Sequence, residues 1–425
     1  MSVYFNSANN LSGDITDCLY SDNTGIKHSI SSIWGNKDNS VVKLWGKDEE
    51  KIDDPYAVGS SNELLHWYYK LDETNNTVTL TKFNSGTANP VAYSSYELNG
   101  KVYRTKIGNA GANYSTGLLY KTKIVTVAFG NNIDFSDTTN ISNMFYNCSA
   151  LKSIDFGSNF NTNNVTDMRN MFNNCNVLEN LDLSNFNTDN VTDMSFMFNN
   201  CKKLKTINLS NFNTNNVTDM RNMFNNCNVL ENLDLSNFNT DNVTDMSFMF
   251  NNCNLLTDMH KYIEVFNMNN VKNMSYMFAS NNIQNIDTCN WDIKNVQNLC
   301  GLFQKITTLK HVNMENLDVT NAFDFTYMFS ECNSLEEVNL KNIKFKTTFD
   351  IGSHSIRMTR MFENCTRLES VDLTTWGLHK STYMDYMFNG CSNLNAVYID
   401  RNVWVNPYTT SFIFNNTNTS SFTYI

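Results

Sequence analysis

The sequence predicts a solenoid, a fold in which short repeated units stack on one another and pair their strands in parallel. A dipeptide of Met, Leu or Ile followed by Phe recurs in one phase, mostly at steps of 25 to 28 residues. In addition, residues 158–201 and 210–253 are identical over 44 positions. Solenoids tolerate such a duplication because each unit contacts only its neighbours. The dipeptides begin at Met144, Met171, Met197, Met223, Met249, Met277, Leu302, Met328, Met361, Met387 and Ile413.

One unit, Asn190 to Thr214, has the pattern V-x-x-M-x-x-M-F-x-x-C-x-x-L-x-x-I-x-L followed by a polar stretch. The segment L-x-x-I-x-L alternates like a strand with one buried face. The Met and Phe spacing of three and four predicts a short helical or 3₁₀ turn. The polar stretch is typical of a loop, with Phe186, Phe212 and Phe238 pointing inward. A unit this short cannot bury its own apolar face, so stacking must cover it.

This unit resembles the repeat of the BspA-like leucine-rich-repeat surface proteins of bacteria. The resemblance covers residues 141–425 and implies a leucine-rich-repeat solenoid with a role in adhesion or recognition. Such proteins normally carry an export signal and a wall or lipid anchor. The first ten residues here lack the basic and apolar regions of a secretory signal, and no anchor sequence is visible. The sequence therefore shows no visible means of export or anchoring, which favours a role other than a cell-anchored one.

The N-terminal third does not repeat. Residues 1–58 are predicted to be a small attachment module around a β-hairpin, in which Ile33-Trp34 and Leu44-Trp45 flank a polar turn. The hairpin, residues 31–46, is similar to the openings of some phage tail and other virion proteins. Residues 59–140 are predicted to be a β-rich cap that covers the first repeat, and a separate globular domain is the alternative. Expected strands are Thr77–Phe83, Lys101–Ile107 and Lys123–Phe129, with a hairpin turn at Asn99-Gly100.

Composition and motifs argue against several function classes. The net charge is −11, whereas nucleic-acid binding needs a basic stripe. No apolar run reaches the ~18 residues that a membrane-spanning helix requires. The six His residues show no metal-ligand spacing, and no phosphate-binding loop or nucleophile motif occurs. We therefore predict no enzyme activity, no cofactor and no metal.

A ladder of cysteines follows the dipeptides, four residues after the first residue of each. Asn281 and Ile306 replace Cys in two units, which indicates a buried packing position rather than a disulfide framework. Disulfides between adjacent units and a metal site are the alternatives, although no C-x-x-C motif occurs. Reduced thiols indicate assembly in a cytosol-like compartment. The ladder comprises Cys148, Cys175, Cys201, Cys227, Cys253, Cys332, Cys365 and Cys391.

A second ladder consists of asparagines whose side-chain amides are expected to bond along the array and satisfy loop backbone groups. Its members are Asn164, Asn190, Asn216, Asn242, Asn270 and Asn295.

The candidate binding surface is the outer face of the predicted sheet, where the x positions of L-x-x-I-x-L are displayed. This face is polar, and a plain solvated sheet is the alternative. Specificity is expected in the units after Asn254 and in the insertion at 345–353, with aromatic anchors such as Tyr262, Phe325 and Trp376. The candidate binding residues are Asp182, Asn208, Asp234, His260, Asp287, His311, Asn313, Asn339, Asp372 and Tyr398.

These observations predict a non-enzymatic recognition protein. The favoured hypothesis is a phage or phage-like tail or fibre component, assembled in the bacterial cytoplasm and located in the virion. Residues 1–58 would contact particle proteins, and the solenoid would bind a host-surface glycan or protein. A BspA-like adhesin on the bacterial surface and a structural decoration protein without a ligand are the alternatives. The sequence leaves the ligand, the host and any oligomer open.

Overall fold

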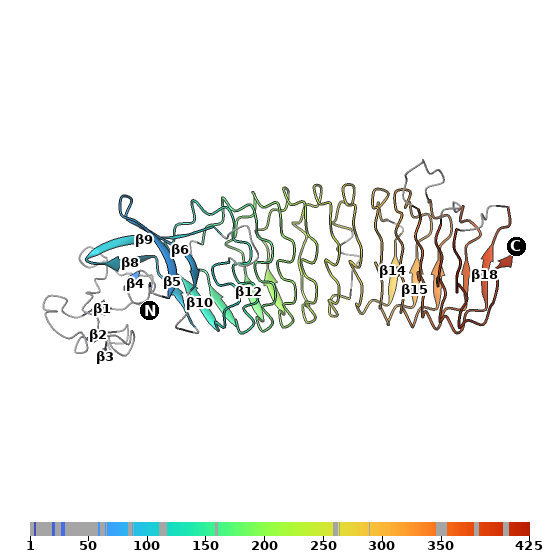
Figure 1. Ribbon diagram of the computed structural model, residues 1–425, viewed down its shortest axis with the longest axis horizontal. Helices are drawn as coiled ribbons and strands as arrows, with labels where there is room; N and C mark the ends of the chain where they lie inside the picture. Colours follow the sequence, from blue (N-terminus) through green and yellow to red (C-terminus); the bar gives the residue numbers. More distant parts are fainter. Residues whose placement is uncertain are drawn as a thin grey trace. The chain divides into compact units, whose positions relative to one another are not determined.

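The computed structural model describes residues 64, 66–83, 87, 89–109, 117–157, 160–257, 262, 264–288, 290–345, 355–377, 382–402 and 408–425. It also gives the backbone of β1 (Tyr4–Phe5), β2 (Leu19–Ser21), β3 (Lys27–Ser29) and β4 (Val58–Gly59). The predicted hairpin at 31–46 lies outside the described residues. The chain forms two compact units, Met1–Asn190 and Val191–Ile425 (Figure 1).

The first unit contains a five-stranded sheet in the order β4-β8-β9-β6-β5. A tight turn joins β8 to β9, with Asn99 at φ 53° and Gly100 at φ 75°, as in the hairpin that Asn-Gly predicts. The two strands predicted at Thr77–Phe83 and Lys101–Ile107 are confirmed with those bounds. The strands are β5 (Trp67–Asp72), β6 (Thr77–Phe83), β8 (Ser95–Leu98) and β9 (Lys101–Ile107).

A second sheet of the first unit leads into the repeats. Strand β10 (Thr126–Phe129) pairs in parallel with β7 (Val91–Ala92) on one side and with β11 (Ser153–Asp155) on the other. The strand expected at Lys123–Phe129 is therefore present but begins three residues later. Because β11 belongs to the first repeat, backbone pairing continues without a break from the N-terminal sheet into the solenoid.

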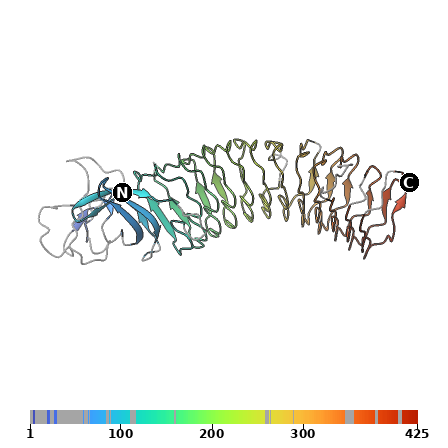
Figure 2. The ribbon, with the colours of Figure 1, turned by 45° about the horizontal axis from the view of Figure 1, so that its top comes forward.

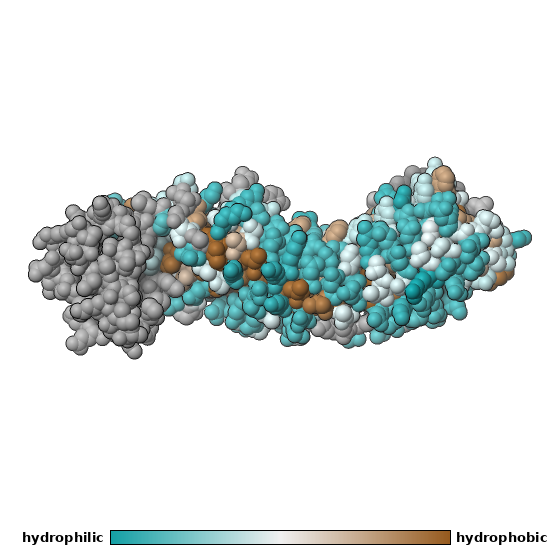
Figure 3. Space-filling model, turned by 90° about the horizontal axis from the view of Figure 1, so that it is seen from below, coloured by the Kyte–Doolittle hydropathy of each residue, from teal (hydrophilic) through white to brown (hydrophobic). Residues whose placement is uncertain are grey.

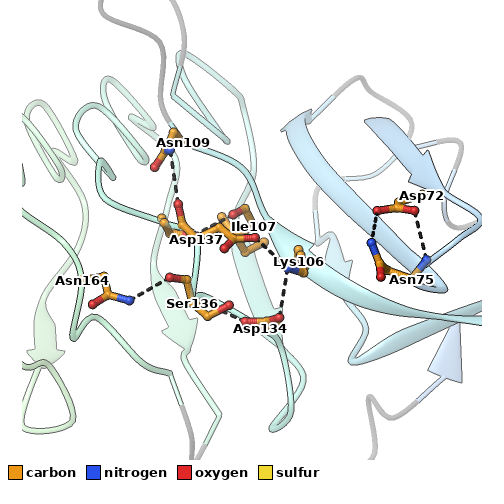
Figure 4. Close-up of polar contacts among 10 residues, drawn as sticks. Asp72, Asn75, Lys106, Ile107, Asn109, Asp134, Ser136, Asp137 and Asn164 are labelled. Atoms are coloured by element: carbon orange, nitrogen blue, oxygen red, sulfur yellow. Dashed lines mark hydrogen bonds and ion pairs between the residues drawn. The ribbon is translucent and has the colours of Figure 1, made fainter.

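Polar contacts of β9 join the five-stranded sheet to the start of the repeats (Figure 4). Lys106 Nζ lies 2.6 Å from the Asp137 carboxylate and 3.5 Å from that of Asp134. The backbone of Ile107 donates to the Asp134 carbonyl at 3.2 Å, and Asp134 donates to Thr105 at 2.8 Å. These bonds hold β9 beside the segment that leads from β10 into the first repeat, and the cap over residues 59–140 stays a prediction.

Each repeat forms one turn of the solenoid, which we call a rung. Its short strand exposes the first and third residues and turns the middle one inward, as in the exposed, buried, exposed pattern of Asn285–Asp287. In the second unit the strands line one side of the stacked rungs (Figures 1 and 2). The strands of the rungs are β12 (Asn180–Asp182), β13 (Thr206–Asn208), β14 (Asn285–Asp287), β15 (His311–Asn313), β16 (Glu337–Asn339), β17 (Ser370–Asp372), β18 (Ala396–Ile399) and β19 (Thr423–Tyr424).

The segment around each Met-Phe dipeptide differs from the predicted helical or 3₁₀ turn, because it is built from consecutive tight turns. Two residues per rung have left-handed backbone, such as Asn222 at φ 56° and Asn226 at φ 59°. This conformation stops a helix from propagating, and Asn adopts it more readily than most residues. Alternate N–H groups then point to the next rung, as Phe224 N does to Met249 O at 3.0 Å.

Aromatic stacking runs through the core of the second unit. The dipeptide Phe rings from Phe198 to Phe414 follow one another at centroid distances of 5.3 to 6.2 Å. Their planes are nearly parallel, for example 1° between Phe224 and Phe250. Each ring therefore covers the next, and a rung lacking its neighbour would expose this ring to water.

The cysteines of the ladder are buried and form no disulfide. Beyond the first rung, thiols of the ladder donate to the Phe carbonyl of the preceding rung, as Cys253 Sγ does to Phe224 O at 3.0 Å. Asn281 occupies the same position in the next rung and donates to Phe250 O at 2.9 Å. Asn therefore replaces both the volume and the hydrogen bond of Cys, whereas Ile306 supplies volume alone.

The asparagine ladder also has the predicted structural role. Asn164, Asn190, Asn242, Asn270 and Asn295 each donate through Nδ2 to a backbone carbonyl of the preceding rung at 2.6 to 2.9 Å. These amides satisfy loop carbonyls that form no strand pair, so the loops of successive rungs are held in register.

Loss of one ring should destabilise the array locally. Phe224 is fully buried between Phe198 and Phe250, so Phe224→Ala leaves a cavity that should lower the unfolding free energy by about 3–5 kcal/mol. Urea unfolding measures the total effect. Amide hydrogen exchange should show loss of protection in adjacent rungs and retention beyond residue 328. The exposed Glu231→Ala is the control. Equal loss of protection in every rung would contradict nearest-neighbour stabilisation.

The thiols should make the fold sensitive to alkali. Burial raises the pKa of Cys253 to about 12 from an ordinary value of 9.0. The thiol is therefore neutral in the folded chain, and its contribution to stability is full below pH 9 and is lost as the pH rises toward 12. Cys253→Ile, which copies the residue found at Ile306, should fold at pH 7 and lose less unfolding free energy between pH 9 and pH 12 than the parent. Identical pH profiles in denaturant unfolding would show that the thiol contributes nothing.

Candidate functional site

The candidate site is the outer face of the strands, which carries two rows of side chains. The first residue of each strand, or its equivalent in a rung without a strand, forms the strand-start row, and the third forms the strand-end row. The strand-start row is exposed in most rungs. Within it, Nδ1 of His311 and Oε2 of Glu337, on adjacent strands, lie 3.7 Å apart. The strand-start row comprises Ser153, Asn180, Thr206, Asn232, Asn285, His311, Glu337, Ser370 and Ala396. The strand-end row comprises Asp155, Asp182, Asn208, Asp234, Asp287, Asn313, Asn339, Asp372 and Tyr398.

The structure places most predicted binding residues in the strand-end row, where they also stabilise the chain reversal after each strand. Asp182 Oδ1 accepts the backbone N–H of Ser184 at 3.0 Å, and Asp372 Oδ1 accepts that of Thr374 at 2.9 Å. Asn208, Asp234, Asn313 and Asn339 accept equivalent bonds. A side-chain oxygen bonded two residues ahead stabilises a turn, which explains why Asp and Asn recur here. The sequence pattern predicted binding alone for these residues and did not reveal this structural role.

Side chains of the strand-end row also bond along the array. Asn339 Nδ2 donates to Asn313 Oδ1 at 3.0 Å, and Asn313 Nδ2 donates to Asp287 Oδ1 at 3.3 Å. Asp287 therefore lies beside an amide rather than beside a second carboxylate, which avoids like-charge repulsion between adjacent strands. The result is a rigid, preorganised row of hydrogen-bonding groups.

Several predicted anchors lie elsewhere. Tyr262, Phe325 and Trp376 are buried in the core, and Trp376 Nε1 donates to Leu340 O at 3.2 Å, so their prediction as surface anchors is wrong. They were misassigned because large aromatic residues serve both cores and interfaces. Tyr398 is half-buried in β18. His260 lies outside the described residues, as does the insertion apart from Phe345.

A third row was not predicted from the sequence. It consists of the residue before the first Met of the V-x-x-M-x-x-M-F pattern, which is a carboxylate in several rungs. Asp219 forms parallel backbone bridges to Asp193 and Asp245, and its Oδ1 accepts the N–H of Arg221 at 3.0 Å. Burial raises the pKa of Asp219 to about 6, the two neighbouring carboxylates add to this, and Arg221 opposes it. The recurring T-D-M tripeptide was the available signal.

The described residues hold no group of three or more His, Cys, Asp or Glu side chains placed to bind a metal ion. Nor do they include a helix with the length and apolarity needed to cross a bilayer. On the face shown in Figure 3, hydrophilic residues prevail and hydrophobic ones form small separate groups. This polar surface fits hydrogen-bonding contacts better than burial of a large apolar patch.

Neutralising the partly buried carboxylate of Asp219 should stabilise the protein near neutral pH. The pKa of Asp219 in the folded chain exceeds its ordinary value of 3.8, so its favourable contribution is present below that value and is lost as the pH rises through 6. Asp219→Asn keeps the acceptor for Arg221 N and matches Asn273 and Asn298, which occupy this position in later rungs. We expect up to ~3 kcal/mol of added stability at pH 7 and no gain at pH 3.5, measured by denaturant unfolding. The exposed Asp241→Asn is the charge control, and an equal gain there would contradict the assignment to burial.

Comparison with known proteins identifies the repeats. No curated protein matches the chain. A leucine-rich-repeat protein from Bacteroides ovatus has 15% identity and a TM-score of 0.43, covering 79% of this chain and 93% of that one. A leucine-rich cell surface protein from Faecalibacterium prausnitzii has 16% identity and a TM-score of 0.38, covering 84% and 93%.

A family model matches residues 139–259, 230–343 and 341–422, which together cover most of the chain. The predicted resemblance to BspA-like leucine-rich repeats is confirmed. The chain belongs to the family described as "Mycoplasma protein of unknown function, DUF285".

Proposed function

We propose that the chain is a non-enzymatic recognition protein that acts as an adhesin at a bacterial surface. Its ligand is an extracellular protein or glycan, and the contact surface is the outer face of the strands. The observation that supports this most is the difference between the two sides of the strands. In the described strands β11 to β18 the inward-facing middle residue is Ile, Leu or Val, whereas the strand-start row varies through Ser, Asn, Thr, His, Glu and Ala. A constant core with a variable exposed row suits recognition by a repeat scaffold.

The chemistry of this face supports a ligand bound by hydrogen bonds and charge. His311 and Glu337 present opposite polarity 3.7 Å apart, and the strand-end row beside them is held by Asn313 and Asn339. Fixed polar groups lose little entropy when a ligand binds. The ladder thiols bond to backbone carbonyls, and the strand-end carboxylates Asp182 and Asp372 hold the chain reversals that follow them, so these groups serve the scaffold. This distribution favours binding over catalysis.

A second candidate is a particle component that binds a host through the same face. It rests on the similarity of residues 31–46 to the openings of virion proteins. The BspA-like repeats support the adhesin more directly, because they make up most of the chain. Immunolabelling separates the two: signal on the cell envelope supports the adhesin, whereas signal confined to purified particles contradicts it.

The outer face should be required for binding. The full chain should bind host cells saturably, and the double variant His311→Ala, Glu337→Ala should lose more than about fivefold in affinity, because hot-spot side chains carry most of an interface's energy. Flow cytometry with labelled protein measures this loss.

Lys305→Ala, Glu331→Ala is the matched control. These two residues form an ion pair at 3.4 Å between the same two rungs, but on the segment that follows the dipeptide rather than on the strands. Equal loss in both double variants, or no binding to cells or to a glycan array, would contradict the proposal and favour a decoration protein.

A further inference from the structure

Strand β5 (Trp67–Asp72) forms one edge of the five-stranded sheet, and among the described residues it pairs only with β6. Natural edge strands are usually short or otherwise protected, because their unpaired backbone groups can bind another strand. β5 has six residues, whereas the strands of most rungs have three. It also exposes large side chains, since Tyr68 is 56% exposed, Tyr69 37% and Leu71 42%. This edge is therefore a candidate surface for strand addition.

Backbone groups of alternate residues point to the free edge of β5. Thr81 Oγ1 of β6 donates to Tyr68 O at 2.9 Å, so the Tyr68 carbonyl faces β6. Because backbone groups alternate sides along a strand, those of Trp67, Tyr69 and Leu71 face away from β6. Each of these three residues supplies one N–H donor and one carbonyl acceptor to the free edge.

One face of β5 continues the core side of β6. Tyr69 lies opposite Leu80 and Leu71 lies opposite Val78, and both residues of β6 are fully buried. Tyr69 and Leu71 therefore extend an apolar face to the edge of the sheet, where water still reaches them. The other face carries the exposed ammonium of Lys70, which forms no ion pair in the part of the chain that the structure describes.

We propose that β5 pairs with β5 of a second copy of this chain, in antiparallel orientation about a two-fold axis at Tyr69. In this register Tyr69 lies opposite its own copy, and Trp67 lies opposite Leu71 of the second copy. Tyr68 lies opposite Lys70 of the second copy. Apolar side chains then meet on the core side, and each ammonium meets a tyrosine ring on the other side. The backbone groups that face the free edge are the ones that pair.

Charge and overlap select this register and a second copy as the occupant. An axis at Lys70 would place like charges directly opposite each other. An axis at Leu71 would pair only three residues of each strand, against five for the axis at Tyr69. A shift by one residue would place core-side side chains opposite exposed ones. The pairing goes beyond the proposed recognition function: a dimer carries two recognition surfaces and gains avidity, while β5 lies outside the proposed contact surface.

Cysteine substitutions in the full chain test the register. Tyr69→Cys places two thiols at the axis, where the Cα atoms of a hydrogen-bonded pair lie about 5.5 Å apart, within the ~4.4–6.8 Å that a disulfide spans. Lys70→Cys and Leu71→Cys separate the Cα atoms by roughly 9 Å and 14 Å, beyond that range. Under mild oxidation only Tyr69→Cys should form a covalent dimer on a non-reducing gel, with the parent chain as the background control. Cross-linking of Lys70→Cys or Leu71→Cys to an equal or greater extent would overturn the proposal.

Sedimentation velocity tests the association itself. A short strand pair buries a small interface, so the parent chain should dimerise reversibly between about 1 µM and 1 mM. Tyr69→Lys and Tyr69→Glu should each stay monomeric, because like charges meet at the axis, whereas an equimolar mixture of the two should associate. Lys82→Glu is the matched control, since it changes an exposed charge on β6 and should dimerise like the parent. A monomeric parent, or a mixture that stays monomeric, would refute the dimer, and retained cell binding would then leave the recognition function standing.

Discussion

The structure depends on one constraint: each rung of about 26 residues is too short to bury its own apolar face, so its neighbours must cover it. The stacked Phe rings, the thiols bonded to the preceding Phe carbonyl and the loop amides all satisfy groups of one rung with groups of the next. Even the tight turns follow this logic, because their left-handed residues direct alternate N–H groups along the array. Stability is therefore a property of pairs of rungs.

This constraint also determines which side chains remain for function. Asn, Asp and Cys are abundant, but most of the described ones bond to the scaffold. The Asp and Asn residues that end the strands hold the following chain reversal, so they offer a ligand fixed geometry rather than free groups. Side chains of the strand-start row do not hold these chain reversals, and their identity varies from rung to rung. Functional specificity is therefore expected in the strand-start row.

Much of this architecture follows from sequence periodicity. The alternation of L-x-x-I-x-L predicted the strands, and replacement of Cys by Asn281 and Ile306 indicated the packing position. The spacing of Met and Phe led to a wrong prediction of a helical or 3₁₀ turn, because a period of three to four does not distinguish a helix from successive tight turns. The recurrent Asn before and after the dipeptide, at Asn222 and Asn226, was the available signal for left-handed backbone.

The candidate site was less predictable. Trp376 and Tyr398 both diverge from the repeat, yet one is buried and the other is half-buried in a strand, because packing of the adjacent rung decides exposure. Identical segments also differ in structure, since Asn180–Asp182 forms β12 whereas Asn232–Asp234 contributes a single bridge at Asn232, and the rungs on both sides of the two segments differ in sequence. Neighbour-dependent structure of this kind requires the assembled array.

The most direct test of nearest-neighbour stabilisation is removal of residues 158–209, one full 52-residue period of the duplication. The deletion joins Gly157 to Ser210, and residues 210–253 then restore the sequence that normally follows Gly157. Hydrogen exchange of the shortened chain is measured beside that of the full chain. If rungs depend only on their neighbours, protection beyond residue 254 is unchanged. Loss of protection throughout that region would show that the chain folds as one interdependent globule and would contradict the account.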